Sequence, residues 1–340
     1  MLTKRQNLIE TLKGENGHPD RFVNQYEAFS ILYATPVTIQ SPMPAYGGEP
    51  VKDAWGVTKA WPEGTPGAFP VHKPDTIVCP DVEEWQETVH APVLDYPEAE
   101  WEACLAEVEK IDRNEYFVAP MYAPGIFEQC HYLMEISNAL MAFYEDPEDM
   151  HDLIKYITEW ELKVAEQTCD HIHPDAMFHH DDWGTQISTF MSPDMFAEFF
   201  LEPYKEVYGY WKENGVELII HHSDSFAQTL VPYMVEMGID IWQGVMDTND
   251  INKIEEEWGG KLTCMGGINS AYVDYEGATY EEVYAAVKTA IDKYGNDGKY
   301  FIPCNTQGAP GMSIFPGVYD MVSKAIDEYG AIYFKEHGLA

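Results

Sequence analysis

The sequence predicts an α/β protein built as a (β/α)8 (TIM) barrel with an irregular N-terminal extension. From about residue 116 to the end of the chain, short apolar strand-like segments alternate with helical segments. Polar clusters follow several of these strands, which is where barrel enzymes carry their catalytic groups. No GxGxxG or Walker-type loop opens a helix, and this disfavours the competing open, doubly wound sheet.

The N-terminal third, residues 1–110, is expected to be partly loop-rich within one domain that spans residues 1–340. Residues 1–14 are predicted to form a short amphipathic helix. The segments SPMPAYGGEP, DAWGV and WPEGTPGAFP that follow are punctuated by proline and glycine, which favours loops. Loops of this length in a compact enzyme often form lids or pocket walls.

Beyond residue 115 the predicted strands and helices alternate, which indicates parallel βαβ units. The helical segments carry apolar residues at a period of three to four. The predicted strands are residues 115–124, 176–184, 217–225, 239–246, 261–270 and 300–308. The predicted helices are residues 126–146, 146–169, 192–215, 226–238, 249–260, 279–295 and 317–330.

The chain is strongly acidic, with 58 acidic against 20 basic residues and a formal net charge of −38. This field repels phosphate backbones and anionic lipid surfaces, so neither nucleic acid nor a membrane is an expected partner. The only arginines are Arg5, Arg21 and Arg113. Because arginine is the usual bidentate ligand of carboxylates and phosphates, the substrate is expected to be neutral or to carry few negative charges.

The sequence also predicts a cytoplasmic protein with reduced thiols. Its first residues lack the apolar region of a signal peptide, and no apolar run approaches the roughly 18 residues of a membrane span. The six cysteines show neither CxxC pairs nor the spacing of a small disulfide-bonded domain.

The first polar cluster is HHDDWGTQ at residues 179–186, directly after a predicted strand. Successive side chains of a strand point to opposite faces, so only some of these groups can face the barrel interior. Capping of a helix or turn by Asp181 or Asp182 is the structural alternative. The candidate catalytic residues are His180, Asp181 and Asp182, and the candidate substrate-binding residues are Trp183 and Gln186.

The second cluster is HHSDS at residues 221–225, directly after an apolar run. His222 and Asp224 lie two positions apart, so in an extended chain their side chains share one face. A His-x-Asp pair can chelate a metal or hold an acid–base histidine in one tautomer, which makes both residues catalytic candidates. Capping of the next helix by Asp224 or Ser225 is the structural alternative.

The third cluster is PCNTQ at residues 303–307, after the last predicted strand. A lone cysteine is usually a small buried apolar residue, but Cys304 lies in line with the other two clusters. His222, Asp224 and Cys304 together offer nitrogen, oxygen and sulfur donors that can hold Zn²⁺ with one open position. Asn305 is a candidate substrate-binding residue.

A rival metal set consists of Glu236, Cys264 and Cys304. Glu236 is predicted to lie well along a helix, away from the carboxyl ends of the strands, and Cys264 lies deep in its strand. Geometry therefore disfavours this set, although Cys264 can still face the barrel interior.

In their order and spacing, these segments resemble the uroporphyrinogen decarboxylase superfamily over roughly residues 110–335. The resemblance implies a (β/α)8 barrel with its cleft at the carboxyl ends of the strands. The segments that carry it are HHDDWGTQ (179–186), SPDMFAEFFLEPYKEV (192–207), LIIHHSDS (218–225), MVEMGIDIWQG (234–244), CMGGINS (264–270) and FIPCNTQG (301–308).

The superfamily contains decarboxylases, which grip porphyrinogen carboxylates with an arginine-rich N-terminal segment, and methyltransferases that work with a corrinoid protein. Here FVNQYEAFSILYATP has no arginine beyond Arg21, which disfavours porphyrin chemistry. Many of the methyltransferases bind zinc through His-x-Cys after one strand and a cysteine after the last. His222 and Cys304 match this pattern, and Asp224 replaces the first cysteine, which implies a harder, more Lewis-acidic site than thiol activation uses.

The resemblance therefore implies the methyltransferase component of an O-demethylase, which passes the methyl group of a methoxylated phenol to the Co(I) of a separate corrinoid protein. Zinc is the expected cofactor. The partner is expected to carry the cobalamin, because the nearest match to Asp-x-His-x-x-Gly, at residues 149–154, lacks the glycine. The alternatives are another methyl donor or a thiol acceptor, a uroporphyrinogen-type decarboxylase, and a non-enzymatic binding module.

Breaking an aryl methyl ether leaves a phenolate, whose parent phenol has a pKa of about 10. A Lewis acid or a general acid at the ether oxygen lowers that barrier, and Zn²⁺, Asp181, Asp182 and His180 are the candidate donors. Aromatic residues of the N-terminal segment are expected to wall the substrate: Tyr26, Phe29, Tyr33, Tyr46 and Trp55.

Overall fold

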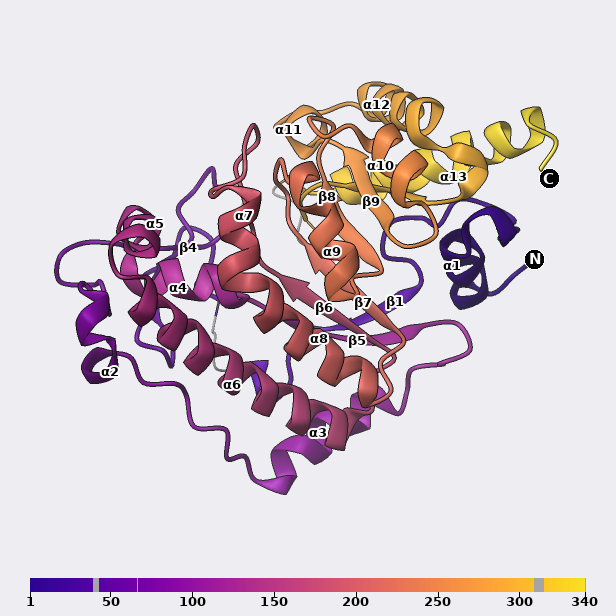
Figure 1. Cartoon of the computed structure of the whole chain (residues 1–340). Helices are drawn as coiled ribbons and strands as arrows, with labels where there is room; N and C mark the ends of the chain where they lie inside the picture. Colours follow the sequence, from indigo (N-terminus) through magenta and orange to yellow (C-terminus); the bar gives the residue numbers. More distant parts are fainter. Residues whose placement is uncertain (39–42, 66, 309–314, 340) are drawn as a thin grey trace.

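Seven parallel strands form the central sheet of the computed structural model, which describes residues 1–38, 43–65, 67–308 and 315–339. Connecting helices lie outside the sheet (Figure 1). The predicted barrel architecture is confirmed, with seven parallel strands rather than eight in the described part of the chain. In spatial order the strands are β1 (Phe29–Leu32), β5 (Phe117–Tyr122), β6 (Ala176–His180), β7 (Leu218–His222), β8 (Ile241–Val245), β9 (Thr263–Ile268) and β10 (Phe301–Asn305).

Gln25, just before β1, bridges the seam between the first and last strands. Its backbone N–H donates to the Pro303 carbonyl at 3.3 Å, and its Oε1 accepts the Asn305 N–H at 3.3 Å. The residue is completely buried and has a φ of 52°, which residues other than glycine seldom adopt. The hydrogen bonds of Gln25 therefore link the seam, where the described residues form no eighth paired strand.

Two parts of the N-terminal third depart from the expected loops. β1 pairs in parallel with β5, with Phe29 opposite Phe117. A separate antiparallel sheet contains β2 (Val51–Lys52), β3 (Thr58–Ala60) and β4 (Phe69–Pro70). Strands this short carry too little alternation to be recognised from sequence. Residues 41, 42 and 66 of the expected loops lie outside the described residues.

The helix predicted over residues 126–146 is divided at Glu135. Its φ of 77° ends one helix, and its carboxylate accepts the N–H groups of Ser137 and Asn138 at the start of the next. None of the described helices combines the length and apolar character needed to cross a membrane. The helices are α2 (Trp85–Thr88), α3 (Glu98–Val108), α4 (Ile126–Met134), α5 (Ile136–Glu145), α6 (Pro147–Ile172), α7 (Pro193–Phe196), α8 (Glu202–Glu213), α9 (Val231–Met237), α10 (Ile251–Trp258), α11 (Ser270–Val273), α12 (Tyr280–Tyr294) and α13 (Val318–Glu336).

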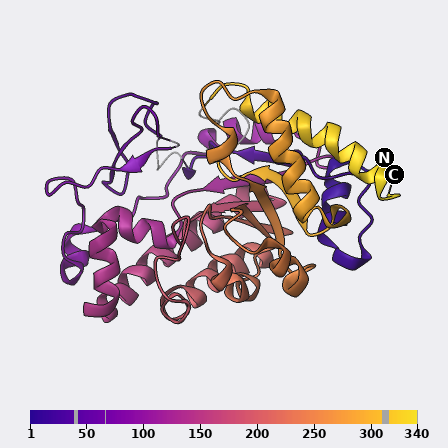
Figure 2. The ribbon, with the colours of Figure 1, turned by 90° about the horizontal axis from the view of Figure 1, so that it is seen from above.

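Helix α1 (Lys4–Leu12) covers the amino ends of the strands. The guanidinium of Arg5 contacts Asp175 at 3.2 Å and also pairs with Glu217, and these two acids directly precede β6 and β7. Leu8 packs into the barrel interior. The two chain termini lie together on this side of the molecule (Figure 2). Because this end is covered, the carboxyl end of the barrel is where a ligand site is expected.

Side chains alternate between two cores along each barrel strand. Phe178 and Ile220 belong to the interior core, whereas Met177, Ile219 and Trp242 pack against the surrounding helices. β6, β7 and β8 thus have both faces buried, as parallel strands in barrels do. The same alternation decides which polar residues at the strand ends point into the barrel.

Glu255 of α10 is a buried carboxyl group whose ionised form the fold disfavours. Its Oε1 has no hydrogen-bond partner among the described residues, and burial raises its pKa from 4.5 to about 9. The pKa is higher in the folded chain than in the unfolded one, so the free energy of unfolding falls as the pH rises from about 4.5 towards 9. We expect Glu255→Gln to stabilise the protein by about 2 kcal/mol at pH 8.

Urea unfolding at pH 5 and pH 8 measures this effect, with Glu256→Gln on the exposed side of the same helix as the control. The stabilisation by Glu255→Gln should shrink at pH 5, and the control should change nothing. An equal effect of Glu255→Gln at both pH values would show that Glu255 is not the group responsible.

Candidate functional site

A cavity of about 1000 Å³ lies at the carboxyl ends of β5, β6 and β7. None of the three arginines, all of them described, lines it. Its polar lining contains one lysine, Lys59, and several acids and histidines: His72, Glu128, His131, Glu161, His180, Asp182, His222 and Asp224. Its aromatic lining comprises Tyr26, Tyr33, Trp55, Trp61, Phe69, Tyr122, Tyr132, Trp160, Phe178, Phe190 and Trp211.

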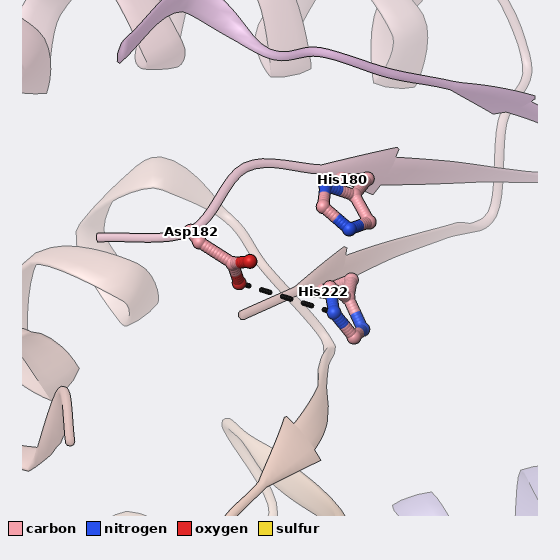
Figure 3. A group of neighbouring side chains, drawn as sticks. All are labelled: His180, Asp182 and His222. Atoms are coloured by element: carbon pink, nitrogen blue, oxygen red, sulfur yellow. Dashed lines mark ion pairs between the residues drawn. The ribbon is translucent and has the colours of Figure 1, made fainter. Parts of the chain in front are cut away.

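Three of these polar side chains converge at the ends of β6 and β7 (Figure 3). His180 and Asp182 lie two positions apart along the chain, and the strand register places His180 opposite His222. One potential ligand atom from each residue lies within 4.8 Å of the other two. The two imidazole rings stack with their centroids 4.4 Å apart, and His222 Nε2 lies 3.9 Å from Asp182 Oδ1. Two imidazoles and a carboxylate in this arrangement form a possible metal site.

Neighbouring side chains hold both imidazoles in the orientation that a metal needs. His180 Nδ1 donates to Glu128 Oε2 at 2.9 Å, and His222 Nδ1 donates to Gln243 Oε1. The Gln243 amide is oriented by its own Nε2, which donates to the Asn305 carbonyl at 3.4 Å. With each Nδ1 engaged, Nε2 of each ring remains for a ligand, as is usual in metal sites with an outer shell of hydrogen bonds.

Acidic side chains around His180 favour a positive charge at this site. Burial opposes the charged form of His180, but Glu128, Asp182 and Asp224 raise its pKa to about 10. Burial and the neighbouring His180 lower the pKa of His222 to about 4. The acids therefore stabilise one positive charge beside His180, carried either by a proton or by a metal ion that displaces it.

Asp181, a predicted catalytic residue, faces away from the cavity and does not line it. Its carboxylate accepts the backbone N–H groups of Phe127 at 2.9 Å and Glu128 at 2.8 Å, and also the hydroxyl of Tyr204. A Cβ added to Gly125 would lie 2.6 Å from the Asp181 Cβ, so this approach requires glycine. Asp181 is the cap of α4, and by holding the first turn of α4 it positions Glu128.

The metal set predicted from the sequence is not the set that the fold brings together. Cys304 is completely buried, with its Sγ 3.9 Å from Gln25 Oε1 and 4.0 Å from Gln243 Nε2, and burial raises the pKa of its thiol. Asp224 lines the cavity, where its N–H donates to Asp182 Oδ1 at 2.9 Å. Of the three predicted ligands, only His222 belongs to the observed cluster.

The rival set is not assembled either. Glu236 pairs with Lys205 at 3.2 Å and is half-exposed on α9. Cys264 points to the outer face of its strand and packs in the core between sheet and helices. Since Cys304 faces the interior core, these three side chains belong to three different environments.

Of the four predicted substrate-binding residues, Tyr26 alone lines the cavity. Trp183 is buried, with its ring stacked 3.9 Å from that of His221. Gln186 is exposed on a loop and Asn305 is buried, and both lie outside the cavity lining. Of the other aromatic residues expected as walls, Tyr33 and Trp55 line the cavity, but Phe29 and Tyr46 do not.

The sequence interpretation missed Glu128, Gln243 and Lys59. Gln243 had a recognisable signal, because it is the single polar side chain inside the segment IWQGV at residues 241–245. Glu128 lies in a helix with other acids and amides nearby, and nothing local distinguishes it. Lys59 belongs to the small sheet, where its Nζ pairs with Asp53 at 3.1 Å.

Comparison with known proteins agrees with this TIM-barrel-like fold. The family model for uroporphyrinogen decarboxylase (URO-D) matches residues 109–314. The chain therefore belongs to the uroporphyrinogen decarboxylase family. No curated protein matches it.

Among solved structures, a methyltransferase from Methanosarcina mazei superposes with a TM-score of 0.65 at 13% sequence identity. The alignment covers 97% of this chain and 99% of that one, and it shows that the two share a fold. An endo-beta-1,4-xylanase from Gloeophyllum trabeum superposes with a TM-score of 0.41 at 8% identity, over 68% of this chain and 81% of that one, which is too weak to carry an argument.

Adjacent aspartates provide a matched pair of variants. Asp182→Asn removes a proposed ligand from a partly exposed position, so we expect Zn²⁺ affinity to fall at least about 10-fold with little change in stability. Asp181→Asn weakens a buried cap and should lower the free energy of unfolding by about 1–3 kcal/mol. Competition with a chromophoric chelator and urea unfolding measure the two effects, and the reverse pattern would contradict the assignment.

Cys304 provides a second test of the ligand set. Because its Sγ faces Gln25 and Gln243, we expect Cys304→Ser to bind Zn²⁺ within about 2-fold of the original chain, whereas His222→Ala should lose most of its affinity. Equal losses of Zn²⁺ affinity in the two variants would instead support His222, Asp224 and Cys304 as the ligands.

Proposed function

We propose that this protein is the methyltransferase component of an O-demethylase. It would transfer the methyl group of an aryl methyl ether, such as a methoxylated phenol, to the Co(I) of a separate corrinoid protein. The observation that carries the proposal is one cavity that combines many aromatic side chains in its lining with a metal-type cluster of His180, Asp182 and His222. Membership of the uroporphyrinogen decarboxylase family and the shared fold with a methyltransferase support it.

The residues of the cavity suit each part of this reaction. A zinc ion held by His180, Asp182 and His222 would supply a Lewis acid for the ether oxygen. Aromatic walls, including Tyr26 and Phe178, would orient the substrate ring and exclude water. Hydrogen bonds that the two imidazoles donate to Glu128 and Gln243 keep the rings in place.

Decarboxylation of a porphyrinogen is disfavoured by where the arginines lie. Arg5 pairs with acids at the amino ends of β6 and β7, the opposite end of the barrel from the cavity. Arg113 also pairs with Asp175 there, and Arg21 pairs with its neighbour Asp20. A substrate that carries several carboxylates would find no arginine in the described lining.

The corrinoid is proposed to come from a partner that docks over the carboxyl end of the barrel. The nearest match to a cobalamin-binding motif, residues 149–154, is part of the long helix α6. Its His151 stacks on the ring of Phe199 at 4.3 Å and has the exposure of a surface residue. A histidine in this position is not arranged to act as a lower ligand of cobalt.

A methylated ammonium compound is the second candidate donor. Four acids, Glu128, Glu161, Asp182 and Asp224, line the cavity against one lysine. Aromatic faces together with negative charge are the environment that binds quaternary ammonium groups. The two candidates use the same acceptor, so a panel of donors separates them.

The test follows the loss of Co(I) absorbance when the zinc-loaded protein, a reduced corrinoid protein and each methyl donor are mixed. We expect transfer from methoxylated phenols and not from methylated ammonium compounds. Asp182→Asn should slow transfer by about 100-fold or more, and Asp194→Asn on the surface should not. Transfer from the ammonium donors alone would favour the second candidate, and no transfer from any donor to a competent acceptor would overturn the methyltransferase proposal.

A further inference from the structure

A second layer of buried polar groups lies directly behind the candidate metal site. His179 and His221 are the outward-facing neighbours of His180 and His222, and the strand register places them opposite each other. The hydroxyl of Tyr208, on α8, lies 2.9 Å from Nδ1 of both rings. All three side chains are completely buried and none of them lines the cavity.

The hydrogen bonds of this bridge can run in one direction only. His221 Nε2 lies 3.1 Å from the carbonyl oxygen of Asp181, which can only accept, so a neutral His221 donates from Nε2 and accepts at Nδ1. The hydroxyl of Tyr208 therefore donates its only hydrogen bond to Nδ1 of His221. The tyrosine oxygen then accepts from Nδ1 of His179, whose Nε2 lies 3.5 Å from Oε1 of the cavity-lining Glu161.

The bridge lies where the backbone ladder between the two strands ends. Beyond His180 and His222 the two chains enter loops, and Asp181 N–H still bonds to the His222 carbonyl at 3.1 Å. Removing the Tyr208 hydroxyl would leave two buried imidazole nitrogens without a partner, which favours rotation of the rings and a shift of the strand ends.

We propose that Tyr208 is a positioning residue of the site: its hydroxyl ties β6 to β7 behind the cavity and sets the spacing of His180 and His222. This inference rests on the metal centre of the proposed function. Tyr208 does not line the cavity, and its hydroxyl bonds to His179 and His221, so its effect on the centre is transmitted through the two strands that carry them.

The test uses Tyr208→Phe, which keeps the ring that packs 5.5 Å from Tyr204 and removes only the hydroxyl. Tyr210→Phe, on the same helix with a partly exposed ring, is the matched control. Co²⁺ alone is the probe, because its visible absorption reports ligand geometry as well as binding. We expect Tyr208→Phe to bind Co²⁺ about 10-fold more weakly and with an altered spectrum, and the control to match the original chain.

A loss of stability without a spectral change would mean that Tyr208 only satisfies buried groups, and it would overturn the positioning role. If Tyr208→Phe binds Co²⁺ with the original affinity and spectrum, the inference fails and the proposed function stands. If the original chain binds no Co²⁺, the metal centre itself fails, and the inference fails with it.

The direction of the bridge is tested on the unaltered chain, so the result does not depend on folding of the variant. In a protein labelled with ¹⁵N in its histidine rings, long-range NMR correlations distinguish the two neutral tautomers. We expect His221 protonated at Nε2 and His179 protonated at Nδ1, with resonances assigned through His179→Gln and His221→Gln. His221 protonated at Nδ1 would contradict the bridge.

Discussion

The candidate site depends on the alternation of side chains at the paired ends of β6 and β7. In this register, His180, Asp182 and His222 face the cavity. Their immediate neighbours in the sequence face the helices, where Asp181 caps α4 and where His179 and His221 bond to Tyr208. Since the side-chain period of a strand is two, a shift of one strand by one residue would exchange the groups that face the cavity with those that hold the scaffold.

This arrangement explains how closely spaced polar residues divide their tasks. The inward groups are held from outside: α4 supplies Glu128 to His180, and β8 supplies Gln243 to His222. Asp181 in turn holds the start of α4, so adjacent aspartates serve the metal site and its support. The acids around His180 stabilise a positive charge, which is the electrostatic requirement of a cation site.

The sequence predicted the barrel because the alternation of strands and helices is a local pattern, and it predicted that only some side chains of the cluster at residues 179–186 could face inward. It could not identify which ones, because β6 and β7 are buried on both faces and their first residues, AMF and LII, are all apolar and do not distinguish an inner from an outer face. The outer hydrogen bonds and the seam at Gln25 come from residues distant in sequence. Cys304 lies near the carboxyl end of β10, and its place in the sequence does not reveal that its thiol is enclosed.

The position of a bound metal ion tests this account most directly. Crystals grown with Zn²⁺ and measured at the zinc absorption edge would locate the ion by anomalous scattering. The account predicts one strong peak between His180, Asp182 and His222, with Glu128 and Gln243 on the Nδ1 atoms of the two imidazoles. A peak between His222, Asp224 and Cys304, or a fully occupied zinc site elsewhere in the chain, would contradict it.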